Sequence, residues 1–346
     1  MKSFFAALLF LVVSATNAVY GQKHVDRVKF FTDTSVVNAT LTLNFKKIMS
    51  EKDKLGRIYP ATFSCKMGDS LDINDHILLE VRGHFRREHC YLPPLKVIFN
   101  TDESSAFYKL KSLKLVSNCM VSNSDDQNLL KEYLIYKMYN LITDKSFRVR
   151  LLDLSYQDSS GKKKTITQHA FLLEDIKELA KRNGCVDWTD SNGKKFATES
   201  TDRRQMTIVA MFEYMIGNTD WSVPVNHNVK IIHSKKDSLS RPYVIPYDFD
   251  FSGFVNTTYS VPDERLGIES VRERLYRGFP RSIEELNVVT DIFKKQKENI
   301  YALINNFNLL TPATKKDVIW YLDDFFKTIN DPAQVQYIFI SNARKE

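Results

Sequence analysis

The sequence predicts an α+β protein in two lobes, the first rich in β-strands and the second mostly helical. Alternating or β-branched apolar runs are concentrated before residue 175, whereas apolar residues at helical spacing dominate after residue 200. Strands early and helices late are typical of α+β folds, because strands that alternate with helices would build a parallel sheet instead. We expect a β-rich lobe over residues 22–176 and a mostly helical lobe over 177–346.

Each element of this prediction rests on a local pattern. Period-two alternation predicts strands, and one amphipathic helix is expected near residue 129, where apolar residues recur every three or four positions with charges between them. The expected strands are Ala39–Phe45, Ile77–Arg82, Leu95–Phe99, Leu110–Val116, Val149–Tyr156 and Thr165–Leu173. The expected later helices are Ile176–Arg182, Asp202–Ile216, Glu284–Asn306 and Lys315–Ile329, with short apolar segments at Val229–His233 and Tyr243–Tyr247.

The first 21 residues have the pattern of a secretory signal peptide. Lys2 precedes an apolar run of ten residues, Phe4–Val13, which is too short to span a bilayer, and small residues follow up to Ala18 and Gly21. We therefore expect an exported protein that is periplasmic, on the cell surface or secreted. No later run reaches 18 apolar residues, so the mature chain is expected to have no transmembrane segment.

The charge distribution and the cysteine spacing argue against nucleic-acid binding and against a zinc site. The 346 residues have a net charge of +7, and lysines alternate with acids almost everywhere, so no nucleic-acid groove is expected. None of the four cysteines has the spacing of a zinc site. In an oxidising compartment one or two disulfides can form, and three pairings of Cys65, Cys90, Cys119 and Cys185 remain open.

The strongest chemical signal is a loop after the expected helix Asp202–Ile216. It contains Asn218, Asp220 and Asn228, and the next apolar segment ends at Asp248 and Asp250. An acid, an amide and a second acid in this order fit phosphoryl transfer, in which one carboxylate orients the attacking hydroxyl while the others hold Mg²⁺ against nucleotide phosphates. Taken alone, such residues also shape ordinary turns.

Several charged residues of the first half could complete such a site. Lys96 lies between apolar residues of an expected strand and Glu132 opens the amphipathic helix, while Arg82 and Arg86 flank a glycine between two strands. Arginine forks suit phosphate oxygens. The alternatives are an edge-strand lysine, a surface helix charge and exposed hairpin arginines.

At these residues the chain resembles the CotH-type spore-coat kinases, an atypical branch of the protein-kinase-like superfamily, including exported homologues of bacteroidete type. The resemblance covers most of the mature chain and is clearest between residues 77 and 280. It implies a bilobal protein-kinase-like fold with a β-rich N-lobe, one amphipathic helix and a mostly helical C-lobe. The similar motifs are Arg82-Gly83 with Arg86, the strand lysine Lys96, Lys131–Leu134, Phe171–Glu174, Asn218-x-Asp220 with His227-Asn228, and Tyr247–Asp250.

The resemblance also implies roles, with ATP and Mg²⁺ as cofactors. Asp220 would orient or deprotonate the hydroxyl of an unknown protein or glycan acceptor. Lys96, held by Glu132, would bind nucleotide phosphates together with Arg82 and Arg86, and Glu174 would lie at the nucleotide-binding hinge. The implied metal ligands are Asn228 and Asp248, with Asp250 as the runner-up to Asp248 and Asn226 competing with Asn228.

Two other functions remain open. Because ATP is scarce outside the cytoplasm, an exported chain of this kind could instead be a catalytically inactive pseudokinase that serves as a surface or envelope binding module. The sequence Asp248-Phe249-Asp250 also has the form of the DxD metal motif of nucleotide-sugar transferases. That reading requires strands alternating with helices near the N-terminus, which the early strands lack.

Overall fold

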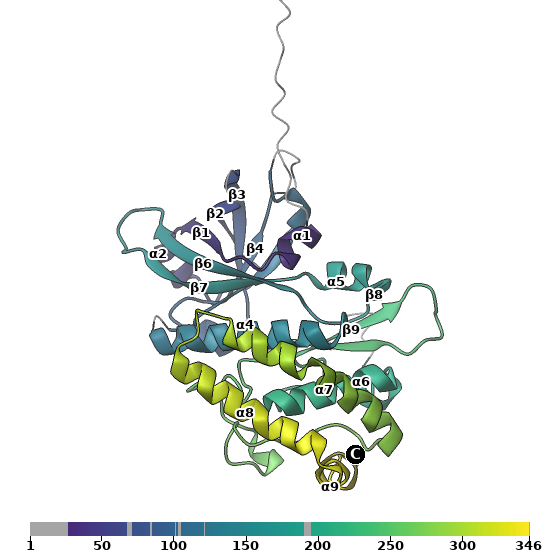
Figure 1. Cartoon of the computed structure of the whole chain (residues 1–346). Helices are drawn as coiled ribbons and strands as arrows, with labels where there is room; N and C mark the ends of the chain where they lie inside the picture. Colours follow the sequence, from purple (N-terminus) through teal and green to yellow (C-terminus); the bar gives the residue numbers. More distant parts are fainter. Residues whose placement is uncertain are drawn as a thin grey trace, which may run out of the picture.

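The computed structural model describes residues 27–345 except 68–70, 84, 101, 103–104, 121 and 190–194. A β-barrel and a group of helices lie on opposite sides of one long helix, α4 (Asn123–Ile142), as Figure 1 shows. The predicted signal peptide, residues 1–21, lies outside the described residues.

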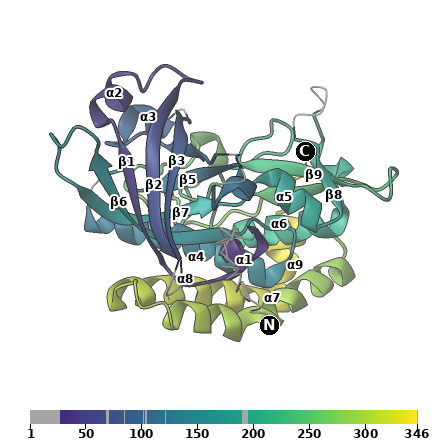
Figure 2. The ribbon, with the colours of Figure 1, turned by 90° about the horizontal axis from the view of Figure 1, so that it is seen from above.

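Seven strands form a closed barrel in the order β1-β2-β3-β4-β5-β7-β6. Neighbouring strands are antiparallel except β1 and β6, which run parallel from Val37 opposite Leu152 to Leu43 opposite Asp158 and close the barrel. Figure 2 looks onto the barrel and shows β1 between β2 and β6. The strands are β1 (Val37–Leu43), β2 (Ile58–Met67), β3 (Leu71–Val81), β4 (Leu95–Ile98), β5 (Ser112–Ser117), β6 (Val149–Asp158) and β7 (Ile166–Leu173).

The predicted bilobal protein-kinase-like fold, with a β-rich N-lobe that includes one amphipathic helix and a mostly helical C-lobe, is wrong. The strands do not form an open sheet but the closed mixed barrel described above. The expected amphipathic helix is also different, because α4 is buried on most of its surface and even Lys131 and Glu132 are buried. Alternation identifies a strand and its inward face, but it does not identify the partner strand, and the parallel β1–β6 pair decides the closure.

The barrel interior is filled by aromatic side chains. Phe63, Phe99 and Phe107 contact one another with ring centroids 5.1–5.9 Å apart, and Phe30 from helix α1 (Arg27–Thr32) packs 6.1 Å from Phe107. Arg150 of β6 is buried and donates to the Asp33 carboxylate at 2.9 Å. This ion pair holds the end of α1 against the barrel.

The helical part of the molecule packs around α4 in a second hydrophobic cluster. The expected helices at 202–216, 284–306 and 315–329 are present within three residues of their predicted ends. The remaining α-helices are α2 (Phe45–Ser50), α3 (Phe85–His89), α5 (Ile176–Arg182), α6 (Arg203–Ile216), α7 (Ile283–Asn305), α8 (Pro312–Asn330) and α9 (Pro332–Gln336). A small antiparallel sheet has the order β10 (Tyr243–Pro246), β9 (Val229–Ser234) and β8 (Cys185–Asp187).

One disulfide joins Cys90, which follows α3, to Cys119, which lies between β5 and α4. Cys65 and Cys185 are free and buried. Among the described residues, no helix combines the length and apolarity needed to cross a membrane.

Candidate functional site

The loop after α6 is built by a tight helix end. Gly217 ends α6 in the left-handed region at φ 65°, and the Tyr321 hydroxyl occupies the space in which a β-carbon would lie. Glycine is therefore required for both its backbone conformation and its lack of a side chain. Asn218 follows, is buried, and accepts the backbone N–H of Asp220 at 3.0 Å. This bond fixes the turn that exposes the Asp220 side chain.

The Asp220 carboxylate is held by two neighbours from the same loop. The backbones of Ser222 and His227 exchange two hydrogen bonds of 2.9 Å, which folds the loop back onto itself. As a result, His227 Nε2 lies 2.7 Å from Asp220 Oδ1, and Asn228 Nδ2 donates to Asp220 Oδ2 at 3.0 Å. Asn226 instead donates to the Thr189 carbonyl at 3.2 Å, so the two candidate asparagines point to different partners.

A second acid lies behind this loop. Glu213 of α6 is 1% exposed, and burial raises its pKa to about 8, which outweighs the opposing influence of the nearby Asn218 amide. Glu213 is therefore protonated at neutral pH. It adds no negative charge beside Asp220, whose charge would otherwise be repelled.

Asp248 and Asp250 follow β10 on a bent backbone. Asp248 has a φ of 67°, and its N–H donates to the Tyr136 hydroxyl of α4 at 2.9 Å. Phe249 is fully buried against Tyr136, with ring centroids 4.8 Å apart. Asp250 is buried and accepts the Tyr259 hydroxyl at 2.8 Å. Burial and the charge of Asp248 raise the pKa of Asp250 to about 6.

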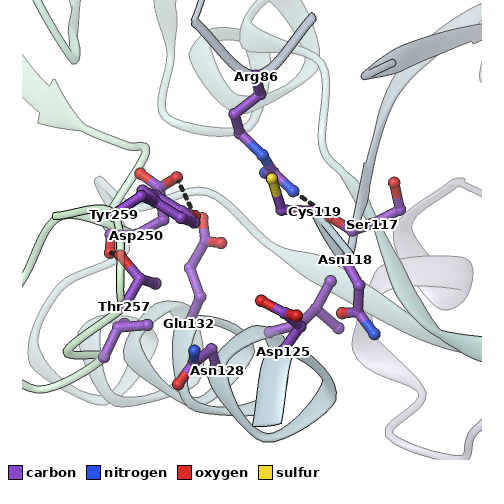
Figure 3. Close-up of a pocket in the computed structure, with 12 residues that line it drawn as sticks. Arg86, Ser117, Asn118, Cys119, Asp125, Asn128, Glu132, Asp250, Thr257 and Tyr259 are labelled. Atoms are coloured by element: carbon purple, nitrogen blue, oxygen red, sulfur yellow. Dashed lines mark hydrogen bonds between the residues drawn. The ribbon is translucent and has the colours of Figure 1, made fainter. Parts of the chain in front are cut away.

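Glu132 of α4 and Arg86 of α3 reach the same region. Figure 3 shows the Glu132 side chain rising from α4 towards Asp250 and Tyr259, with Arg86 pointing down from above. Burial and the charges of Asp250 and Asp248 raise the pKa of Glu132 well above its usual value. Glu132, Arg86, Asp250 and Tyr259 line a small cavity of about 20 Å³. Arg86 donates to the Ser117 carbonyl, so its guanidinium is held by backbone.

A lysine that the sequence analysis did not single out completes the group. Lys114 of β5 lies over the Tyr247 ring at 4.3 Å, and its pKa is lowered to about 8 by burial and by the Arg82 charge, against the pull of Asp248. Arg82 itself donates to the carbonyls of Leu95 and Leu115 at 3.1 Å. We call these six residues the acid–base cluster: Arg82, Arg86, Lys114, Glu132, Asp248 and Asp250.

Lys96 and Glu174 lie in other arrangements. Lys96 is the cross-strand neighbour of both Glu80 and Lys114, and its Nζ pairs with Glu80 Oε2 at 3.2 Å on a partly exposed surface. Glu174 is buried at the end of β7, where both carboxylate oxygens accept from Arg182 at 2.9 and 3.0 Å. The Glu174 carboxylate is therefore engaged in an ion pair that holds α5 against the barrel.

Contacts with distant segments distinguish Lys114, which lies over Tyr247, from Lys96, which pairs with Glu80. Both lysines stand between apolar residues of a strand, and the antiparallel pairing of β4 with β5 places them opposite each other. No signal in the sequence separates the two lysines, because both strands show the same alternating pattern.

No protein-family model matches the chain, and no curated protein matches it. The crystal structure of the proinflammatory kinase CtkA of Helicobacter pylori is similar to this chain at a TM-score of 0.37, with 11% sequence identity. The similarity covers 80% of this chain and 90% of that one. A similarity at this score carries no conclusion about function, and the resemblance to the CotH-type kinases stays a prediction.

Proposed function

We propose that the acid–base cluster binds a nucleoside triphosphate such as ATP together with Mg²⁺, and that the protein transfers the γ-phosphoryl group to a hydroxyl. The observation that supports this proposal is that basic side chains from the first half of the chain lie near acidic side chains from the loop after β10. Arg82, Arg86 and Lys114 supply cations for phosphate oxygens. Asp248 and Asp250 supply hard carboxylate oxygens beside them.

The residues present fit Mg²⁺. The raised pKa of Asp250 reflects burial and repulsion from Asp248, and a cation near both carboxylates relieves that repulsion. Among the described residues no three His, Cys, Asp or Glu side chains gather into a metal cluster. Mg²⁺ usually binds one or two carboxylates together with substrate phosphates and water, so Asp248, Asp250 and the Asn228 amide oxygen form a suitable set. Bound there, the ion would neutralise charge on the phosphates.

Asp220 is the group that we propose to receive the acceptor proton. Its carboxylate is partly exposed, and Asn228 and His227 fix its orientation. A general base must lie within hydrogen-bond reach of the proton that it removes, and the partial exposure of the Asp220 carboxylate supports this role because it leaves the carboxylate accessible to an acceptor.

Thermal unfolding tests nucleotide binding. ATP with Mg²⁺ at about one hundred times its Kd should raise the Tm of the mature protein by about 3–6 °C. Asp248→Asn should abolish this rise, because it removes one carboxylate without changing the size of the side chain. Asp291→Asn, which removes an exposed charge on α7, is the matched control and should keep the full rise.

Asp220→Asn separates transfer from binding. This variant should keep the rise in Tm and lose about 10²–10⁴-fold in the rate of phosphoryl transfer from labelled ATP. An unchanged Tm of the wild-type protein with ATP and Mg²⁺ would contradict the proposal.

A second function is favoured by the position of Arg86. Its guanidinium donates to the Ser117 carbonyl, while burial and the charges of Asp250 and Asp248 raise the pKa of Glu132 well above its usual value, which disfavours an ion pair with Arg86. A chain with this arrangement could serve as a catalytically inactive binding module. In that case the protein would show neither the rise in Tm nor phosphoryl transfer, and a pull-down would recover its partner.

A further inference from the structure

A groove of about 530 Å³ opens beside Asp220, on the side reached by the segment after residue 260. Its volume is within the usual range for ligand-binding sites. The residues that matter for its chemistry are Asp220, Val225, His227, Val261, Pro262 and Leu266. The groove is separate from the small cavity between Arg86 and Glu132.

The exposed apolar part of this groove is aliphatic. Val225 is 63% exposed and Val261 is 71% exposed, although the two residues come from different segments. Exposed apolar side chains that gather in one groove mark contact sites for other apolar groups. Two aromatic residues also line the groove, but Trp221 is only 3% exposed, and the half-buried Phe251 packs against Tyr259 with ring centroids 5.7 Å apart. The two exposed valines suit an aliphatic side chain, which a polypeptide offers and a glycan lacks.

Arg277 holds the backbone of the loop segment that carries Asp220. Its guanidinium donates to the Trp221 carbonyl at 2.8 Å and to the Thr219 carbonyl, which are the residues on either side of Asp220. The backbone at Asp220 is thus held from both sides, and its carboxylate lies at the edge of the groove. Arg277 is a positioning residue in this arrangement.

We propose that this groove binds an extended polypeptide segment in which an aliphatic side chain neighbours the Ser or Thr that receives the phosphoryl group. The inference rests on the proposed function. The acceptor oxygen forms a bond to the γ-phosphorus of the nucleoside triphosphate, the bond from that phosphorus to the β–γ bridging oxygen breaks, and the nucleoside diphosphate leaves. The hydroxyl proton passes to the Asp220 carboxylate.

Two eight-residue peptides test this proposal with the full mature chain. Both carry one central Thr, flanked by leucines in one and by glutamines in the other. With ATP and Mg²⁺, kcat/KM should be about tenfold higher for the leucine peptide, because an apolar subsite discriminates by about this factor. The double variant Val225→Asp/Val261→Asp should remove the preference. Val288→Asp, an equally simple change on exposed α7, should keep it.

Peptide binding is also measured without nucleotide, by fluorescence anisotropy of a leucine peptide in which Ala replaces Thr. Binding by the wild-type protein and its loss in the double variant support the groove even if ATP and Mg²⁺ fail to raise the Tm, in which case only the proposed function is wrong. Equal use of both peptides, a preference that survives in the double variant, or transfer only to an oligosaccharide would overturn the inference while nucleotide binding stands.

Discussion

Asp248 and Asn228 both adopt the left-handed backbone region, with φ of 67° and 51°. Such conformations cost non-glycine residues energy and persist only where their surroundings enforce them, which is common at functional sites. Here the enforcing contacts are visible. The Tyr136 hydroxyl accepts the Asp248 N–H at 2.9 Å, and the Asn228 carbonyl accepts the Tyr247 N–H at 3.0 Å. The backbone is therefore bent at Asp248 and Asn228, which are two of the proposed Mg²⁺ ligands.

Lys114 should contribute to nucleotide binding, whereas Lys96 should not. Since the pKa of Lys114 is lowered to about 8 by burial and by the Arg82 charge, this lysine loses its proton as pH rises above 8. The Kd for ATP with Mg²⁺ should therefore increase up to tenfold per pH unit between about pH 8 and 9.5. Lys114→Arg should remove this dependence, because arginine stays charged. Calorimetric titration at several pH values measures both effects.

Lys114→Met and Lys96→Met form a matched pair at neutral pH. The first should weaken binding at least about tenfold. It removes the attraction between the lysine charge and the phosphates, and a tenfold loss corresponds to roughly 1.4 kcal/mol of binding free energy. The second removes only a partly exposed pair with Glu80 and should change the Kd less than twofold. The reverse order of effects would show that phosphates bind at Lys96.

The sequence marks individual positions that carry acids, amides and cations, but it does not show which side chains meet. The loop acids at 220, 248 and 250 stand out because acids and amides cluster around one expected helix end. Lys96 and Lys114 stand in similar strand patterns, and only their contacts with other segments, Lys96 with Glu80 and Lys114 with Tyr247, separate them. Tyr259 could not be predicted either, because its bond to Asp250 depends on the path of an irregular loop.

At the scale of elements, α4 is held by polar contacts at several places along its length. Near its start, Asp126 accepts the side chain of His169 of β7 at 2.7 Å and the Asn118 amide at 3.1 Å. Farther along, Lys131 donates to the Val255 carbonyl in the loop after Asp250. These contacts join the barrel and the acid-bearing loop to the helix that carries Glu132.

The Asp126–His169 pair should make stability depend on pH. The pKa of His169 is raised, chiefly by its hydrogen bond to Asp126, and burial opposes this only in part. A raised folded-state pKa gives stability that is fully present below the unfolded value of 6.5 and is lost as pH rises through the folded value. The pKa of Asp126 is lowered by the same hydrogen bond, against burial, so its contribution is lost at acidic pH, below 3.8.

His169→Gln should consequently reduce the free energy of unfolding by about 1–2 kcal/mol at pH 5.5 and by less at pH 8.5. Urea denaturation at the two pH values measures the difference. His76→Gln, on the exposed outer side of β3, is the control and should show no such dependence on pH. An equal loss at both pH values would mean that His169 acts through packing rather than charge.

Elements with strong local signals were predictable, and their assembly was not. Asp202 caps α6 by accepting the Gln205 N–H at 2.8 Å, and Gly217 ends it, so both boundaries are encoded locally. The barrel closes through β1 and β6, whose pairing joins Val37 to Leu152. No local pattern specifies a parallel partner more than a hundred residues away, which explains why the expected fold was wrong.

At the scale of the whole molecule, the disulfide crosses the boundary between the barrel and α4. Cys90 follows the short helix that carries Arg86, and Cys119 lies beside Ser117, whose carbonyl holds the Arg86 guanidinium. The bond links residues 29 positions apart and restricts the unfolded chain accordingly. It is also consistent with an oxidising compartment, which remains a prediction from the first 21 residues.

Removal of this disulfide should destabilise the protein without affecting its free cysteines. The variant Cys90→Ala/Cys119→Ala should lose about 2–4 kcal/mol in the free energy of unfolding. A dithiol reductant should lower wild-type stability by a similar amount and leave the variant unchanged, because Cys65 and Cys185 are already free. A variant as stable as the oxidised wild type would contradict this prediction.

The parallel contact between β1 and β6 also has a consequence for the order of folding. During synthesis β1 appears early, and its second edge has no partner until β6 follows more than a hundred residues later. An unpaired strand edge invites pairing with other chains, and contacts of long sequence separation form slowly. The barrel therefore closes late, and the nascent chain needs protection of this edge until then.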